Sequence, residues 1–197
     1  MAGFVLFIVI VAAIAIFWFV AIYNGLIALR NQTANALKQI DVQLKRRHDL
    51  IPNLVQAVQG AMQFEKETLQ AVIEARNQAV KIGAGAGLQN VGKVAAAEAQ
   101  LTGALGKLLA VVEAYPDLKA TGNIGQLQEE LTSTENKIGF ARQLYNDTAT
   151  QYNTRQQQFP MSIVAGFAQA VPAELWEIAD ETERAVPKVD LSMKPKA

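Results

Sequence analysis

The sequence contains no cysteine in its 197 residues. Disulfides, thiolate catalysis, cysteine-ligated zinc and attachment of a lipid to a processed cysteine are therefore excluded. Neither sign of charge is in excess, because Lys plus Arg and Asp plus Glu each total 18. A nucleic-acid-binding protein needs a basic excess to displace counterions from phosphates. The composition thus predicts no nucleic-acid partner.

Motifs for nucleotide binding and nucleophilic catalysis are missing as well. The glycines at 83–87 do not spell G-x-G-x-x-G, and the sequence has no Walker motif and no G-x-S-x-G elbow. The one histidine, His48, follows Lys45 by three residues, so the Glu-x-x-His pairs of a di-iron bundle are absent. We therefore predict no catalytic residue, no cofactor and no metal site, and a hydrolase is the least favoured alternative.

Three carboxylates, Glu129, Glu130 and Glu135, lie close together in the sequence. Paired carboxylates perform acid–base chemistry only in a cleft that shifts their pKa values. Lys137 and Arg142 follow within the same segment. We therefore expect a solvated, salt-bridged helix face.

The N-terminal segment is long and apolar. Every residue from Gly3 to Ile22 is apolar or glycine, and about 20 such residues in helical form cross a bilayer core. Trp18 and Tyr23 lie at its end, where amphipathic rings favour the headgroup level, so both are predicted interface anchors. The alternative is a cleaved signal peptide, but no basic residue precedes the run and the run exceeds a signal core. We predict a transmembrane anchor over 1–22, with the lipid bilayer as partner.

The charges after this anchor predict its orientation. Arg30 and Lys38 follow it within reach of the membrane, whereas only the terminal amine precedes it. The positive-inside rule then favours a single-pass protein with an outward N-terminus and a cytoplasmic C-terminal body. The opposite orientation is the alternative.

The rest of the sequence has the pattern of long helices. Apolar residues recur in steps of three and four, which is the spacing of helices with one buried face, and no segment alternates with period two. Such helices bury their stripes against one another. The predicted fold is all-α, a transmembrane helix continuing into an antiparallel bundle of three to four long helices. The stripes comprise Leu26, Leu29, Thr33, Leu37, Ile40 and Leu44; Leu54, Val58, Met62 or Ala61, Leu69 and Val72 or Ile73; Ala97, Leu101, Leu105, Leu108 and Val112; and Ile124, Leu127, Leu131, Thr134, Ile138, Ala141, Tyr145, Thr148, Tyr152 and Phe159.

Proline and glycine mark the breaks between these helices. Pro52 lacks a backbone donor and crowds the preceding turn, so a continuous kinked helix and two abutting helices are both compatible with the sequence. Four glycines within 81–93 predict a mobile loop. Pro116 and Pro160 are the predicted ends of the two later helices.

The C-terminal part loses the long periodicity. Residues 161–178 are apolar enough to dock on another surface, and 179–197 are polar and predicted to be disordered. The expected organisation is a transmembrane anchor over 1–22, a helical bundle over 23–178 and a tail over 179–197.

The densest charge cluster is KRRHD at 45–49. It lies about 36 Å beyond the anchor along an unbroken helix, too far for a role at lipid headgroups. A solvated face, or charges near the end of a helix dipole, is the favoured interpretation. The alternative is that Arg46, Arg47, His48 and Asp49 form salt bridges between copies of the chain.

Several long motifs stand out from this helical background. They are YNGLIALRNQ at 23–32, IDVQLKRRHDLIPNLV at 40–55, EKETLQAVIEAR at 65–76, EAYPDLKA at 113–120, LQEELTSTENKIGFARQLYND at 127–147, QYNTRQQQFP at 151–160 and GF at 166–167. Together they closely resemble the LemA family of bacterial proteins, over roughly residues 1–178. The resemblance implies one N-terminal transmembrane helix in the bacterial inner membrane and a cytoplasmic helical domain. It implies no catalytic activity, and no functional residue carries over.

Two hypotheses about function follow. The first is a non-catalytic, membrane-anchored scaffold that self-associates into a homo-oligomer and organises or remodels the bilayer. The alternative is a monomeric adaptor that tethers an unidentified soluble partner, such as a protease or an envelope-maintenance protein, to the membrane. Residues 161–178 would then be the docking segment.

Overall fold

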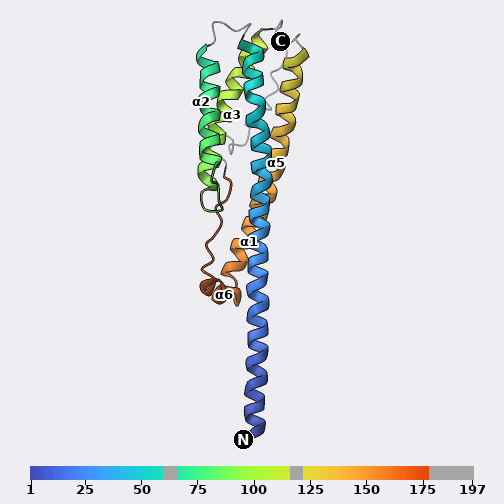
Figure 1. Ribbon diagram of the computed structural model, residues 1–197, viewed down its shortest axis with the longest axis vertical. Coiled ribbons are helices and arrows are strands. Elements are labelled where there is room, and N and C mark those ends of the chain that lie inside the picture. The colour runs from blue at the N-terminus through green and yellow to red at the C-terminus, as the bar shows by residue number, and fades with distance from the viewer. Residues whose placement is uncertain (60–65, 116–121, 178–197) are drawn as a thin grey trace, which may run out of the picture.

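The computed structural model describes residues 1–59, 66–115 and 122–177. In these ranges the chain forms helices without any strand, as the sequence predicts. The helices are α1 (Ala2–Gln59), α2 (Lys66–Gly83), α3 (Val91–Ala114), α5 (Gly122–Gln157) and α6 (Met161–Phe167) (Figure 1).

Helix α1 joins the apolar N-terminal segment to the body without interruption. Its N-terminal part projects alone from one end of the molecule (Figure 1), and none of its most apolar 18-residue window is buried. By length and composition this part can cross a membrane. Helix α3 also meets those criteria, but its apolar side chains form the centre of the bundle.

Four long helices pack side by side in alternating directions (Figure 1). Helix α1 packs chiefly against α5, and α2 packs chiefly against α3. The predicted antiparallel bundle is therefore confirmed, with four long helices. Helix α6 is a short additional helix beside α1, at the end of the bundle nearer the N-terminus.

The predicted stripes form the core. The last helical stripe is buried from Ile124 to Tyr152, with Leu127 partly covered. Its predicted last member, Phe159, is instead 80% exposed. Helix α5 ends at Gln157, so the helical periodicity no longer determines which way residue 159 points.

The core consists of two clusters stacked along the bundle. One contains Leu37, Leu44 and Tyr145 and lies towards the N-terminal end of α1. The other contains Leu54, Leu101 and other residues that follow along α1 and α3. Charged side chains lie between the two clusters and are described below.

Helix α1 passes through Pro52 and continues to Gln59, so the continuous helix is the correct alternative. Proline has no N–H to offer the carbonyl four residues earlier, which belongs to His48. The Arg76 side chain supplies the missing donor, with its Nε 3.3 Å from the His48 oxygen. Helix α2 thus compensates for the proline of α1.

The glycine-rich loop is shorter than predicted, because α2 extends to Gly83 and α3 begins at Val91. The Asn90 side chain accepts a hydrogen bond from the Gly87 N–H at 2.6 Å. The Leu88 carbonyl accepts another from the Glu174 N–H at 2.7 Å. Helix α3 ends at Ala114, before Pro116, as predicted. The predicted tail over 179–197 and the predicted stripe positions at 61 and 62 lie outside the described residues.

Candidate functional site

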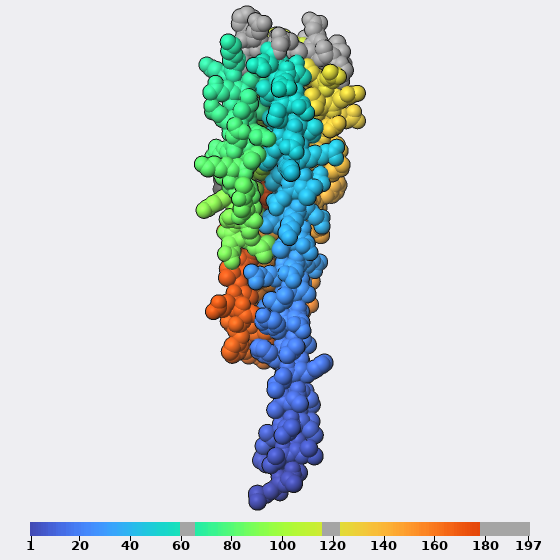
Figure 2. All heavy atoms as spheres, in the orientation of Figure 1, coloured from blue at the N-terminus to red at the C-terminus, as the bar shows by residue number. Residues whose placement is uncertain are grey.

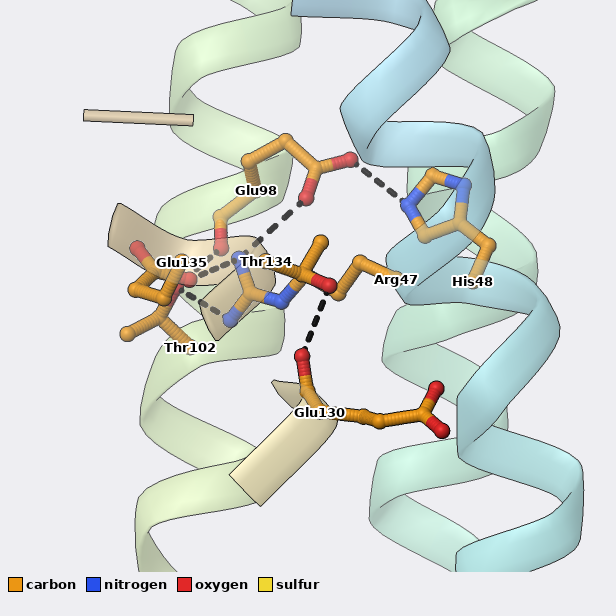
Figure 3. Close-up of polar contacts among 7 residues, drawn as sticks. All are labelled: Arg47, His48, Glu98, Thr102, Glu130, Thr134 and Glu135. Atoms are coloured by element: carbon orange, nitrogen blue, oxygen red, sulfur yellow. Dashed lines mark hydrogen bonds and ion pairs between the residues drawn. The ribbon is translucent and has the colours of Figure 1, made fainter. Parts of the chain in front are cut away.

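A layer of charged and polar side chains crosses the bundle between the two core clusters. We call Arg47, His48, Glu98, Thr102 and Glu135 the polar layer; they come from α1, α3 and α5 (Figure 3). The side chains of Arg47 and Glu98 are each only 6% exposed. Burying charges is costly unless they are paired. The contacts within the layer therefore decide what it can do.

Each buried charge of the polar layer has a partner of opposite sign. Arg47 Nη1 lies 3.0 Å from a carboxylate oxygen of Glu135 and 3.7 Å from Oε2 of Glu98. The other Glu98 oxygen lies 2.8 Å from His48 Nε2. Arg47 Nη2 donates to the Thr102 hydroxyl at 2.9 Å. Three helices are thus joined through one arginine and two glutamates (Figure 3).

The polar layer offers no activated nucleophile. The Thr102 hydroxyl donates to the Glu98 carbonyl at 2.9 Å and accepts from Arg47, while His48 contacts the Glu98 carboxylate. A nucleophilic hydroxyl would need a base as its acceptor. Among the described residues, no group of three or more His, Cys, Asp or Glu side chains could hold a metal ion. The chemistry of this arrangement is charge pairing between helices.

The structure divides the KRRHD cluster into the buried pair Arg47 and His48 and the exposed residues Lys45, Arg46 and Asp49. Arg47 and His48 are buried, so the expectation of a solvated face is wrong for them, because they face α3 and α5. Arg46 and Asp49 are exposed, as a solvated face requires. Contacts between copies of the chain stay a prediction for the four residues Arg46, Arg47, His48 and Asp49, and Arg47 and His48 already have partners within their own chain.

Two of the three predicted glutamates of α5, Glu130 and Glu135, pair with arginines of α1. Glu130 lies 3.8 Å from Arg46, with both side chains 52% exposed, and Glu135 pairs with the buried Arg47. The expected salt-bridged face therefore exists, but its cations come from the neighbouring helix. Lys137 and Arg142 of α5 are not among these ion pairs.

Glu98 is not among the residues predicted above to form a site, although its position in the sequence indicates that it is buried. It lies four residues after Val94 and three before Leu101, on the heptad positions that the buried residues of α3 occupy. Arg47 follows Leu44 by three residues and likewise takes a core position of α1. Opposite charges on the core positions of two helices indicate a buried ion pair.

The chain after α6 forms an extended segment that returns along α5. We call residues 168–177 the C-terminal strap. The Asn153 side chain donates to the Ala173 carbonyl and accepts from the Ala173 N–H, both at 2.8 Å. Asn146 makes the same pair of bonds with Trp176, at 3.0 and 2.8 Å. The sequence alone does not predict this role for the two asparagines.

The spacing of the strap matches that of the helix. Asn146 and Asn153 are seven residues apart, or about 10 Å along an α-helix. Ala173 and Trp176 are three residues apart, which is also about 10 Å in an extended chain. Two side-chain amides on α5 therefore bind the strap backbone in register.

Tyr145 adds a further bond to the strap. Its hydroxyl donates to the Glu174 carbonyl at 2.6 Å. Burial, assisted by the nearby Glu174 charge, raises the pKa of Tyr145 to about 12. The Trp176 ring is buried, with the Arg142 guanidinium 5.8 Å from its centroid. The predicted docking segment is thus divided: Trp176 packs against its own chain, whereas Ile163, Phe167, Val171 and Leu175 are exposed.

An apolar groove lies on the outer surface between α1 and α5. It has a volume of about 350 Å³ and is lined by Val42, Phe140 and Leu144, together with Gln39, Gln43 and Lys137. Val42 is 63% exposed and Phe140 is 75% exposed. Exposed apolar side chains that lie together on a surface are candidates for a binding site.

The predicted interface anchors lie on the part of α1 that projects beyond the bundle. Trp18 is 51% exposed and Tyr23 is 40% exposed. Leu26, the first fully buried residue of α1, follows Tyr23 by less than one turn. The exposed aromatic rings therefore lie where the free segment meets the bundle.

Much of this sequence is similar to the sequences of known proteins. Residues 36–191 match the LemA family. Protein LemA of Metamycoplasma hominis is 29% identical over 164 residues, which cover 82% of this chain and 72% of that protein. Magnetosome protein MamQ 2 of Paramagnetospirillum magneticum is 24% identical over 171 residues, covering 75% of this chain and 63% of the relative.

Magnetosome protein MamQ of Magnetospirillum gryphiswaldense is 22% identical over 168 residues, covering 74% of this chain and 62% of the relative. The chain thus spans less than two thirds of the length of these magnetosome proteins. The family match covers most of the chain and includes the polar layer, the strap and the apolar groove. With its apolar N-terminal helix and helical body, this membrane-associated protein belongs to the LemA family.

Proposed function

We propose that this protein is a non-catalytic scaffold, fixed in the bacterial inner membrane by α1 and self-associating through its helical body. The observation that carries the proposal is the continuity of α1. Its exposed apolar part and its buried core residues belong to one helix of 58 residues. A span and a body joined in this way move together, so contacts between bodies would arrange the spans in the bilayer.

The bilayer is the first partner in this proposal. Gly3–Ile22 would occupy the hydrocarbon core, with Trp18 and Tyr23 at the headgroup level. The first charge after this segment is Arg30. The positive-inside rule then directs the body to the cytoplasm.

A second copy of the chain is the other partner. The apolar groove lined by Val42, Phe140 and Leu144 offers a surface whose burial would favour association. Arg46 and Glu130 lie farther along the same two helices, with opposite charges half-exposed. Apolar centres with polar rims are typical of protein interfaces.

The non-catalytic part of the proposal rests on the polar layer. Arg47, Glu98 and His48 contact one another and Glu135, and Thr102 uses its proton on a main-chain carbonyl. Such a layer favours one register of the helices, since a shifted register would leave buried charges without partners.

The adaptor alternative has less support. It needs the apolar residues of 161–178 to be available for a soluble protein. In the described residues of this segment, Val164, Ala165, Ala173 and Trp176 are buried against the chain itself, which leaves Ile163, Phe167, Val171 and Leu175 as its exposed apolar side chains. We propose the scaffold because it follows from the continuity of α1 and needs no unidentified soluble partner.

Crosslinking in native membranes tests the scaffold. An amine-reactive crosslinker should give a ladder of species beyond the dimer with the natural chain. The double variant Val42→Asp, Phe140→Asp places charges in the apolar groove and should shorten this ladder to the monomer. Ile73→Asp is a matched control, because Ile73 is 42% exposed on α2. Monomers alone from the natural chain at dense expression would contradict the proposal.

A further inference from the structure

We propose that the tip of the hairpin formed by α5 and α6 is a second membrane contact, which inserts into the headgroup and upper acyl region beside the span. The tip comprises residues 158–167. This inference rests on the proposed anchoring of α1 in a bilayer. It adds a surface-lying element to a chain whose sequence predicts only one membrane segment.

The tip lies beside the end of the span. The rings of Phe167 and Phe19 meet edge to face, with their centroids 6.1 Å apart. Phe19 is near the C-terminal end of the apolar segment Gly3–Ile22. In Figures 1 and 2, α6 forms a shoulder at the end of the bundle from which the free part of α1 projects. A bilayer that holds α1 to its last apolar turn therefore reaches α6.

The tip presents large apolar side chains to its surroundings. Phe159 is 80% exposed, Ile163 is 54% exposed and Phe167 is 76% exposed. They recur every four residues, whereas Val164 and Ala165 on the other side of α6 are buried against the bundle. Aromatic and aliphatic side chains exposed on one side of a helix are the groups that an interfacial membrane contact buries at the boundary of headgroups and acyl chains.

The tip carries no charge that would oppose insertion. No Asp, Glu, Lys, Arg or His occurs between Arg155 and Glu174, and none precedes Arg30 in α1. Taking an ionised side chain into the bilayer is costly, whereas this segment meets no such cost. The tip and the neighbouring part of α1 thus carry no charged side chain where they lie side by side.

Arginines border this uncharged zone on both elements. Arg155 is in the last turn of α5, and Arg30 lines a hollow with Gln169 and Val171, directly after α6. Basic side chains just outside the acyl region pair with anionic headgroups. The order of residues along both elements therefore matches the layers of a bilayer surface, with apolar side chains first and positive charges next.

A second copy of the chain is the competing occupant of this apolar surface. We favour lipid because the surface continues the exposed face of the span through Phe19 and Phe167. The apolar groove of the body differs in this respect, because it lies between α1 and α5 beyond Arg30 and next to Lys137.

Nitroxide labelling separates these environments, because the chain has no cysteine and each introduced cysteine is the only one. Ile163→Cys places the label on the tip. Ile73→Cys is the matched control on the body, because Ile73 is exposed on α2 outside the apolar groove, and Ile14→Cys reports on the span. The full chain is reconstituted in vesicles of phosphatidylethanolamine and phosphatidylglycerol. The collision rates of each nitroxide with oxygen and with a water-soluble nickel chelate are then measured.

Insertion predicts a several-fold higher ratio of oxygen to nickel collisions at 163 than at 73, approaching the ratio at 14. A water-like ratio at 163 beside a lipid-like ratio at 14 would overturn the second contact and leave the anchor intact. A water-like ratio at 14 would overturn the anchoring itself. Low rates with both reagents at 163, together with spin–spin broadening between copies, would overturn the lipid contact in favour of a protein interface.

Discussion

Arg76 on α2 donates a hydrogen bond from its Nε to the main-chain carbonyl of His48 on α1, at 3.3 Å. This carbonyl is the one that Pro52 leaves without a helical donor. The bond explains how α1 passes through a proline in its interior without ending there. It also joins α2 to α1 next to the polar layer.

The first prediction concerns this bond. Arg76→Met should lower the free energy of unfolding by about 1 kcal/mol, the usual cost of leaving a partly buried carbonyl without a partner. In a Pro52→Ala background the helix regains its own N–H, so the same substitution should cost clearly less. Chemical denaturation of the full chain in detergent micelles, for all four proteins, measures the difference. Equal costs in both backgrounds would contradict this role of Arg76.

The second prediction concerns the polar layer. Arg47→Met leaves Glu98 buried without its cation and should cost about 3 kcal/mol of unfolding free energy, as for other broken buried pairs. The double variant Arg47→Met, Glu98→Met removes both charges and should be more stable than Arg47→Met alone. Arg46→Met is the matched control, because its pair with Glu130 is half-exposed, and it should cost less than about 1 kcal/mol. A double variant that is the least stable of the three proteins would contradict this account of the buried ion pair.

The third prediction is a dependence of stability on alkaline pH. In the folded protein the pKa of the Tyr145 hydroxyl is raised from its ordinary value of 10.0 to about 12. Above pH 10 the unfolded chain therefore binds fewer protons than the folded chain, and stability falls. The stabilisation from this tyrosine is complete below pH 10 and disappears as the pH rises to about 12.

Tyr145→Phe removes this ionisation and the hydrogen bond to Glu174 together. The variant should be less stable at neutral pH and should lose less stability than the natural chain between pH 10 and 12. Denaturation midpoints of both proteins across this range provide the measurement. Parallel pH profiles would show that Tyr145 does not titrate as its surroundings require.

The fourth prediction concerns the C-terminal strap. Asn153→Asp keeps the acceptor for the Ala173 N–H but replaces the donor to the Ala173 carbonyl by a carboxylate oxygen, which repels it. Together with Asn146→Asp it should release the strap. In a Trp18→Phe background, the fluorescence of Trp176 should shift to longer wavelength as the ring becomes hydrated.

Asn136→Asp provides the control for the strap, because Asn136 is exposed on the same helix. It should leave the fluorescence unchanged. If the double variant also keeps the natural emission, the packing of Trp176 rather than the asparagine bonds holds the strap.

The helical architecture could be predicted from the sequence because it depends on periodicity. The stripe from Ile124 to Tyr152 repeats in steps of three and four, and a helix with that pattern has only one face to bury. The apolar run Gly3–Ile22 could also be predicted, because its length and its composition are those of a helix that spans a bilayer.

The polar layer and the strap depend on contacts between distant segments. Charge at a core position was visible for Glu98, but its partner depends on how α1 and α3 align. Asn146 and Asn153 resemble any exposed polar residues of a helix, and their role appears only once an extended segment lies beside them. Phe159 continued the heptad spacing, yet α5 had already ended at Gln157.

The most direct test of the scaffold is the mass of the full chain in mild detergent, determined by light scattering with the detergent contribution subtracted. We predict a particle of several subunits, and a particle of one subunit for the Val42→Asp, Phe140→Asp variant. A version beginning at Tyr23 indicates whether the body assembles without the span. A single-subunit mass for the natural full chain would contradict self-association and with it the proposed scaffold.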